Sequence, residues 1–146
     1  MSDTSAICID ASFAIKLVAE EELSAEALLL SEAWARDQRS LVAPLLIRYE
    51  VVSALRQKIR RSIMTEPEVH EALTAFLELP MSVTDYTATH VRALQLAVEL
   101  GLGSTYDAHY LALAEDLNCE FWTADGRLYN AIKDRFPLIH SLAEPV

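Results

Sequence analysis

The sequence predicts a single α/β domain over residues 1–146, with a short, mostly parallel five-stranded sheet flanked by about seven helices. Two observations lead to this prediction. Short apolar runs alternate along the chain with longer stretches of helical periodicity, which is typical of β-α units around a parallel sheet. The chain has 146 residues, 52% of them hydrophobic and 23% charged, so its length and composition suit one ordinary core. No internal repeat or linker divides it.

Five short runs of residues have the composition of buried β-strands. Each run is apolar, too short to form a stable helix, and rich in β-branched, aromatic or aliphatic side chains. In chain order, the predicted strands cover residues 7–10, 41–43, 81–84, 120–123 and 138–141.

Helical periodicity and capping residues place the helices between these strands. Ser24 is a good N-cap, and Gly101 ends a helix. Thr65 and Glu68 have the spacing of a capping box. The third and fourth helices follow each other without a strand, so they form a helical hairpin. The predicted helices are a short one directly after Asp10 and six more over residues 24–38, 45–62, 65–77, 86–100, 104–117 and 126–134.

Charge and cysteine content argue against several classes of protein. Twenty-two acidic residues against twelve basic ones give a net charge of −10, which argues against broad coating of nucleic acid or anionic lipid. Cys8 and Cys119 lack zinc-ligand spacing and are predicted to be buried thiols. No apolar stretch approaches the length of a membrane span, and residues 1–6 lack the features of a signal peptide. We therefore expect a cytoplasmic protein, without membrane contact, that touches nucleic acid only locally.

Three aspartates stand at the ends of predicted elements. Asp10 closes the first strand, Asp125 follows the fourth strand, and Asp107 lies in the first turn of the helix that leads into the fourth strand. Because ligands of open α/β sheets bind beyond the carboxyl ends of the strands, these positions are the first candidates for chemistry. Glu50 joins them on a partly apolar face of helix 45–62, where a charge needs a partner.

Each of these acids also has a purely structural interpretation. Asp10 and Asp125 are suitable N-caps for the helices that follow them. Asp107 stands in the third helical position after Ser104, as in a capping box. Glu50 is equally compatible with an exposed ion pair to a base of its own hairpin. Taken one at a time, the acids therefore leave both interpretations open.

The four acids lie in blocks whose order resembles the PIN-domain nucleases, and among them the VapC-type toxins of bacterial toxin–antitoxin systems. The blocks cover residues 9–12, 44–56, 106–114 and 121–128, and the acids are separated by 40, 57 and 18 residues. The resemblance extends over nearly the whole chain and implies a PIN-like fold. It also implies a catalytic and metal-binding acidic quartet with two supporting hydroxyls, Ser12 and Thr123. The acidic quartet consists of Asp10, Glu50, Asp107 and Asp125.

A cluster of carboxylates suits the hydrolysis of a phosphodiester bond. Mg²⁺ or Mn²⁺ can activate a water molecule and neutralise the charge that grows on the phosphoryl oxygens, and carboxylates bind such ions. We assign Asp10, Glu50 and Asp107 to one ion, and Asp125 to a second ion or to orientation of the attacking water. Histidines are not needed, since His109 projects to another helix face and His70, His90 and His140 have no partner at useful spacing.

Five of the twelve basic residues lie in a stretch of fourteen residues that includes Glu50. Such a run is often only a solvated face, but its position beside the quartet favours contact with an RNA backbone or with an acidic segment of a partner. Residues 20–22 are expected to form a solvated acidic loop, and Tyr106 and Tyr110 to be packing residues. The five bases are Arg48, Arg56, Lys58, Arg60 and Arg61.

The predicted function is a metal-dependent endoribonuclease that hydrolyses RNA phosphodiester bonds. The resemblance implies the toxin of a type II pair, inhibited by a cognate antitoxin encoded in a neighbouring gene, and a homodimer. The aliphatic residues of helix 45–62 spread over more than one face, which favours a second packing surface there. Two alternatives are a catalytically idle PIN-fold interaction module and a stand-alone nuclease for other nucleic acids. A phosphotransferase with Asp10 as nucleophile is disfavoured because Ser12 stands where a second Asp is expected.

Overall fold

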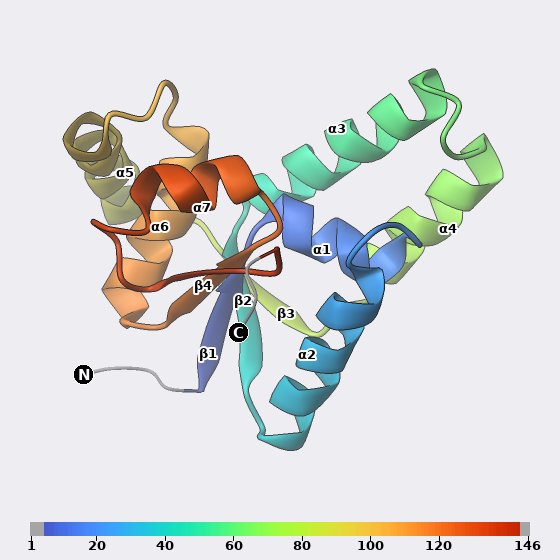
Figure 1. Ribbon diagram of the computed structural model, residues 1–146, viewed down its shortest axis with the longest axis horizontal. Helices are drawn as coiled ribbons and strands as arrows, with labels where there is room; N and C mark the ends of the chain where they lie inside the picture. Colours follow the sequence, from blue (N-terminus) through green and yellow to red (C-terminus); the bar gives the residue numbers. More distant parts are fainter. Residues whose placement is uncertain (1–4, 144–146) are drawn as a thin grey trace.

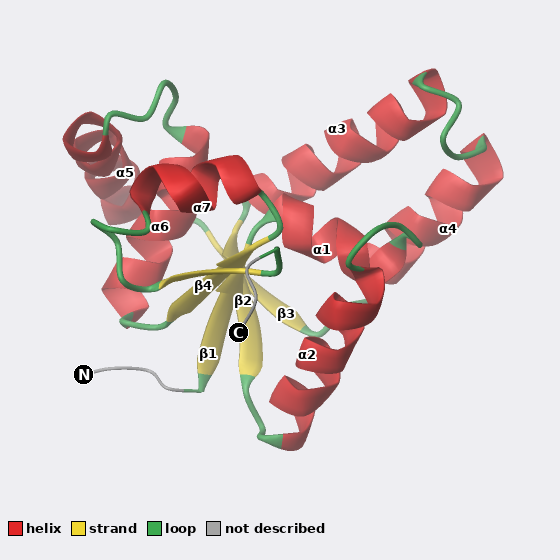
Figure 2. Ribbon diagram, in the orientation of Figure 1, coloured by secondary structure: helices red, strands yellow, loops and turns green. Residues whose placement is uncertain are grey.

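The computed structural model describes residues 5–143, which form five strands and seven helices (Figures 1 and 2). Residues 1–4 and 144–146, among them most of the segment 1–6 considered as a signal peptide, lie outside the described residues. None of the helices within the described range has both the length and the apolar character that a transmembrane segment requires. The strands are β1 (Ala6–Ile9), β2 (Ser40–Pro44), β3 (Met81–Thr84), β4 (Glu120–Thr123) and β5 (Ile139–Ser141).

All strand pairs of the sheet are parallel, and the strand order is β3-β2-β1-β4-β5. The chain therefore extends the sheet from β1 through β2 to β3, and then crosses back to add β4 and β5 on the other side of β1. The strand order reverses between the neighbouring strands β1 and β4. Open α/β sheets bind their ligands at such a point, beyond the carboxyl ends of the strands. The register pairs Ile9 with Trp122, so the next residues, Asp10 and Thr123, close two adjacent strands.

Helices cover both faces of the sheet (Figure 1). On one side α6 packs against β1, β2 and β4, with α5 beside it, while α1 and α3 contact β4 and β2 from the other side. Helices α3 and α4 form a hairpin that projects from the sheet. The helices are α1 (Ala11–Val18), α2 (Ser24–Arg36), α3 (Leu46–Arg60), α4 (Glu66–Leu77), α5 (Thr87–Leu100), α6 (Tyr106–Leu117) and α7 (Gly126–Ile132).

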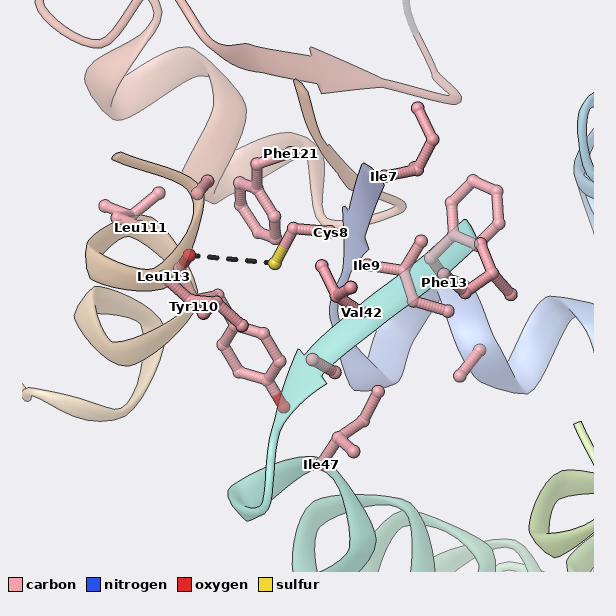
Figure 3. Packing of buried hydrophobic residues seen from close by; sticks show 14 of the residues in the cluster. Ile7, Cys8, Ile9, Phe13, Val42, Ile47, Tyr110, Leu111, Leu113 and Phe121 are labelled. Carbon is pink, nitrogen blue, oxygen red and sulfur yellow. Dashed lines mark hydrogen bonds between the residues drawn. The ribbon is translucent and has the colours of Figure 1, made fainter. Parts of the chain in front are cut away.

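The core lies between the sheet and these helices. Ile7, Cys8 and Ile9 of β1 are fully buried, and Figure 3 shows them between Phe13 of α1 and the side chains of α6. Burial of such aliphatic and aromatic side chains is the main stabilising contribution to the fold. Cys8 and Cys119 are both buried, as predicted for structural thiols.

The structure confirms the predicted α/β class, the parallel sheet and the number of helices. Strands 81–84 and 120–123 match their predicted bounds. The capping box of Thr65 and Glu68 is present, and Gly101 ends α5 with a left-handed φ of 68°. Gly is suited to this conformation because it has no Cβ.

Two predicted helix caps are wrong. Leu23, not Ser24, stands at the N-cap of α2, with a φ of 70°. The Ser24 hydroxyl instead accepts from the Glu21 N–H and donates to the Ala19 carbonyl, which fixes the loop before the helix. Helix α6 begins at Tyr106 without a side-chain cap. The capping-box interpretation of Asp107 is therefore wrong, and its carboxylate is available for another role.

Candidate active site

Asp10 lies at the carboxyl end of β1 and is only 5% exposed. Its side chain caps α1, since Oδ1 accepts from the Phe13 N–H at 3.0 Å. The same oxygen accepts from Ser12 Oγ at 2.6 Å, and Oδ2 accepts from Thr123 Oγ1 at 2.5 Å. The N-cap interpretation of Asp10 is thus correct, but the cap alone does not account for the two additional hydroxyl donors.

The hydroxyls of Ser12 and Thr123 link the carboxyl ends of β1 and β4 through hydrogen bonds. Ser12 Oγ accepts from the Ala124 N–H, and Thr123 Oγ1 accepts from the Asp125 N–H, each at 2.9 Å. The two hydroxyl oxygens are 3.2 Å apart. Backbone and side-chain bonds therefore fix the orientation of the Asp10 carboxylate from both strands.

Asp125 follows β4 and caps α7. Its Oδ1 accepts from the Arg127 N–H at 2.9 Å and from the Leu128 N–H at 3.3 Å. Within the described residues, Oδ2 has no hydrogen-bond partner, so one oxygen of this carboxylate remains available for a ligand. The N-cap interpretation is correct for Asp125 too, and it holds the side chain at the carboxyl end of the sheet.

Glu50 reaches the site from α3, where a tyrosine rather than a base holds it. The Tyr110 hydroxyl donates to Glu50 Oε1 at 2.5 Å. Tyr110 is 1% exposed and stacks on Phe121, which confirms it as a packing residue and adds a positioning contact that the sequence analysis missed. Its spacing was the available signal, because Tyr110 and Asp107 stand three residues apart on one face of α6. The prediction of a packing residue is wrong for Tyr106, which is 60% exposed.

Asp107 is the acid that couples the quartet electrostatically. Burial raises the pKa of Asp107, and the charges of Glu50 and Asp125 raise it further. Burial also raises the pKa of Asp10, to about 6, against the lowering effect of the hydrogen bonds from Ser12, Thr123 and Phe13, and the Asp107 charge adds to the increase. All four acids therefore act on a common region, and like charges held close together are typical of a functional site.

The donor atoms of this region suit a hard divalent cation. Among residues 5–143, no three ligating side chains converge closely enough to form a metal cage by themselves. Mg²⁺ commonly binds through one or two carboxylates and keeps several water ligands, so it does not require such a cage. Asp107 has no hydrogen-bond partner among the described residues, and the second oxygens of Glu50 and Asp125 are also unpaired there. These three carboxylates have oxygens available to a hydrated ion.

A cleft of about 450 Å³ opens from the site between α1 and α3. Ser12, Glu50 and Ala124 line it near the acids, and Lys58 and Arg61 line it farther along α3. Two of the five predicted bases thus share a cleft with Glu50. The structure places Arg48 at another hollow, beside Phe76 and Val83, and Arg56 and Arg60 are exposed residues that do not line the cleft.

Two further residues of this cleft were not expected to take part. Lys16 of α1 lines it together with Glu21. Glu21 accepts from Lys16 Nζ at 3.0 Å and from Lys58 Nζ at 2.5 Å, so the prediction of a solvated loop over residues 20–22 is wrong for Glu21. The spacing of Lys16 four residues after Ser12, on one face of α1, was the signal in the sequence.

The histidines lie apart from the acids. His109 Nδ1 is 2.6 Å from the Thr105 carbonyl, and its Nε2 is 2.9 Å from His90 Nδ1. His90 Nε2 in turn lies 3.0 Å from Asp85 Oδ1. His109 therefore faces α5, in agreement with the prediction that it projects to another helix face than Asp107. The prediction that the other three histidines have no partner is wrong, since His70 Nε2 lies 3.6 Å from Glu66 Oε1 and His140 Nε2 lies 3.5 Å from Glu120 Oε1.

Comparison with known proteins relates the chain to a protein family. The family model described as the PIN domain matches residues 7–133. The chain belongs to the PIN-domain family. This PIN domain is 30% identical over 125 residues to the VapC ribonuclease Mb0985 of Mycobacterium bovis, with 84% of the chain and 96% of the relative covered. It is 32% identical over 124 residues to the ribonuclease VapC12 of Mycobacterium tuberculosis, with 84% of the chain and 88% of the relative covered.

A solved structure extends the similarity to the fold. The PIN domain superposes on a chain of a toxin–antitoxin complex from Klebsiella pneumoniae with a TM-score of 0.63 and 20% identity. The alignment covers 95% of this chain and 99% of the other. At this level of identity the likeness bears on the fold alone.

Proposed function

We propose that this PIN domain is an Mg²⁺- or Mn²⁺-dependent endoribonuclease, a hydrolase of RNA phosphodiester bonds and the toxin of a type II toxin–antitoxin pair. The observation that carries the proposal is that Asp10 and Asp125 lie at the carboxyl ends of β1 and β4, where the Asp107 charge raises the pKa of Asp10, and the Glu50 and Asp125 charges raise that of Asp107. The match to the PIN family and the VapC ribonucleases among its relatives support the reaction type.

The roles of the residues follow from their contacts. When bound, a divalent cation supplies an activated water and neutralises charge on the phosphoryl oxygens. Asp10, Glu50 and Asp107 would hold it, with Asp10 oriented by its two hydroxyl donors. The Tyr110 hydroxyl keeps Glu50 directed toward the site. Asp125, fixed as the cap of α7, orients the attacking water or holds a second ion.

The proposed partners are an RNA substrate, an antitoxin from a neighbouring gene and a second copy of the chain. The toxin–antitoxin complex from Klebsiella pneumoniae with the same fold supports the antitoxin. A guanidinium or ammonium group of such an inhibitor would suit the acidic quartet. We expect the pair to act in the cytoplasm. An idle interaction module is disfavoured because all four acids are present and electrostatically coupled.

The decisive experiment compares two aspartates of α6. Asp107→Asn should lower the rate of RNA cleavage at least about 100-fold, the scale on which one preorganised electrostatic group acts. Asp116→Asn is the matched control, since Asp116 is an exposed acid of the same helix. Cleavage is measured with purified protein in the presence of Mg²⁺ or Mn²⁺. Wild-type cleavage by Asp107→Asn, Asp10→Asn and Glu50→Gln alike would show that the quartet is not the active site.

A further inference from the structure

The cleft between α1 and α3 has an acidic end and a basic end. Along α3, Glu50, Ala54 and Lys58 line it at intervals of four residues, which places them on one helix face. Two helical turns separate Glu50 from Lys58, or about 12 Å along the helix axis. A group bound at Lys58 is therefore too far away to be the reacting phosphate, yet it lies in the same cleft.

At the basic end, Glu21 occupies the space between two lysines. Its carboxylate accepts from Lys16 and Lys58, and the three side chains are only 16%, 16% and 25% exposed in the order Lys16, Lys58, Glu21. Burial alone would raise the pKa of Glu21, but the hydrogen bonds from Lys58 and Lys16 outweigh it and hold the pKa below its ordinary value. Glu21 is therefore an anion bound by a two-lysine site.

The charges at this end do not balance. Two ammonium groups face one carboxylate, and Arg61 adds a further positive charge to the lining. Each ammonium has three N–H donors, and within the described residues each lysine has one partner, Glu21. The site therefore has both the charge and the free donors to bind an anion with more oxygens than a carboxylate.

Resting on the proposed nuclease function, we propose that Lys16 and Lys58 bind a backbone phosphate of the RNA near the one that is cut, and that Glu21 occupies this phosphate position until RNA displaces it. An RNA strand can place its reacting phosphate at the acids and run along the cleft. Such a strand brings a neighbouring phosphate to the lysines. Glu21 stands on a loop rather than within a helix, so its side chain can leave the lysines without disturbing α1 or α3.

The test measures binding rather than cleavage, so it does not depend on the catalytic roles of the acids. Affinity for a fluorescein-labelled oligoribonucleotide of mixed sequence is measured by fluorescence anisotropy in EDTA, at a series of KCl concentrations. Lys16→Met and Lys58→Met should each weaken binding by about 3- to 10-fold and lower the slope of log K against log salt by about 0.7, the value for one phosphate contact on a single strand. Glu21→Gln should tighten binding several-fold.

Two controls separate this role from a structural one. Arg36→Met removes an exposed charge from the last turn of α2, outside the cleft, and should leave the salt slope unchanged. Lys58→Arg keeps the charge and should retain most of the affinity. Melting temperatures of all variants identify any that fail to fold. If a lysine variant unfolds, Glu21→Gln still tests the proposal, because this variant is expected to bind RNA more tightly than wild type.

Three results would overturn the proposal. The first is wild-type affinity and salt slope in both lysine variants. The second is weaker RNA binding by Glu21→Gln, which would mean that Glu21 only stabilises the loop between α1 and α2. The third is an RNA affinity that is unchanged in the lysine variants while their binding of a hexaglutamate peptide is weaker. This result would assign the lysines to an acidic protein partner. Absence of cleavage by a wild-type protein that still binds RNA through these lysines would contradict only the proposed nuclease activity.

Discussion

Burial and hydrogen bonding shift the pKa of Asp10 in opposite directions. Its burial favours the neutral acid, whereas its three hydrogen-bond donors favour the carboxylate, and the pKa of about 6 shows that burial outweighs the donors. Unfolding would return the group to its ordinary value of 3.8. The folded protein therefore binds the Asp10 proton more tightly than the unfolded chain does, so ionisation of this side chain destabilises the folded state.

This imbalance predicts that Asp10→Asn stabilises the metal-free protein at neutral pH. The favourable contribution of the protonated form is complete below pH 3.8 and is lost as the pH rises through about 6. At pH 7 the asparagine variant should exceed wild type in free energy of unfolding by up to about 3 kcal/mol. Near pH 4 the difference should nearly vanish. Urea unfolding in EDTA at both pH values measures it.

Asp116→Asn serves as the control for the same comparison, because Asp116 is exposed. Its stability should follow that of wild type at both pH values. An Asp10→Asn protein that is less stable than wild type at pH 7 would show that the hydrogen bonds of the carboxylate outweigh its burial.

Helix α5 has the most extended exposed apolar row in the described part of the chain. Val91, Leu94 and Val98 are 58%, 60% and 76% exposed, and their spacing of three and four residues aligns them on one face. On α3, Val52 and Tyr49 are exposed while Ile47, Val51 and Leu55 are buried. The expectation of a second apolar surface on α3 is thus only partly correct, and α5 offers a larger one for the proposed homodimer.

A charged residue in this row should separate the two copies. We expect the wild-type protein to be a dimer at tens of micromolar by light scattering, and Leu94→Glu to be a monomer with an unchanged fold by circular dichroism. Leu29→Glu is the matched control, since Leu29 is 67% exposed on α2. A monomeric wild-type protein would contradict the homodimer, and a dimeric Leu94→Glu protein would place the interface elsewhere.

The elements show which contacts a sequence can predict. Asp10 and Asp125 close or follow apolar strands, so their position at the sheet edge follows from local patterns. The contact of Tyr110 with Glu50 joins residues 60 positions apart, and that of Glu21 with Lys58 spans 37. Such contacts depend on how α1, α3 and α6 pack, which periodicity does not specify. An acidic run such as residues 20–22 is locally indistinguishable from a solvated loop.

At the scale of the whole molecule, the strand order brings together acids that are far apart in the chain. Because β1 lies between β2 and β4, Asp10 is adjacent to the end of β4, while the helix after β2 carries Glu50 to the same edge. Asp107 comes from α6, which packs against β1, β2 and β4. Most of the core is apolar, so the repulsion among these acids is concentrated at one edge of an otherwise ordinary domain.

This concentration predicts that divalent cations stabilise the folded protein. An ion that binds only the folded state adds about 1.4 kcal/mol at ten times its Kd, which corresponds to a rise in Tm of about 5 °C for a domain of this size. Thermal unfolding with Mg²⁺ or Mn²⁺, against NaCl of matched ionic strength, measures the effect. Asp107→Asn should lose most of the rise, because it removes the acid coupled to the other three, and Asp116→Asn should keep it. An equal rise in NaCl would mean that the acids are screened by salt rather than bound to an ion, and would favour the idle interaction module.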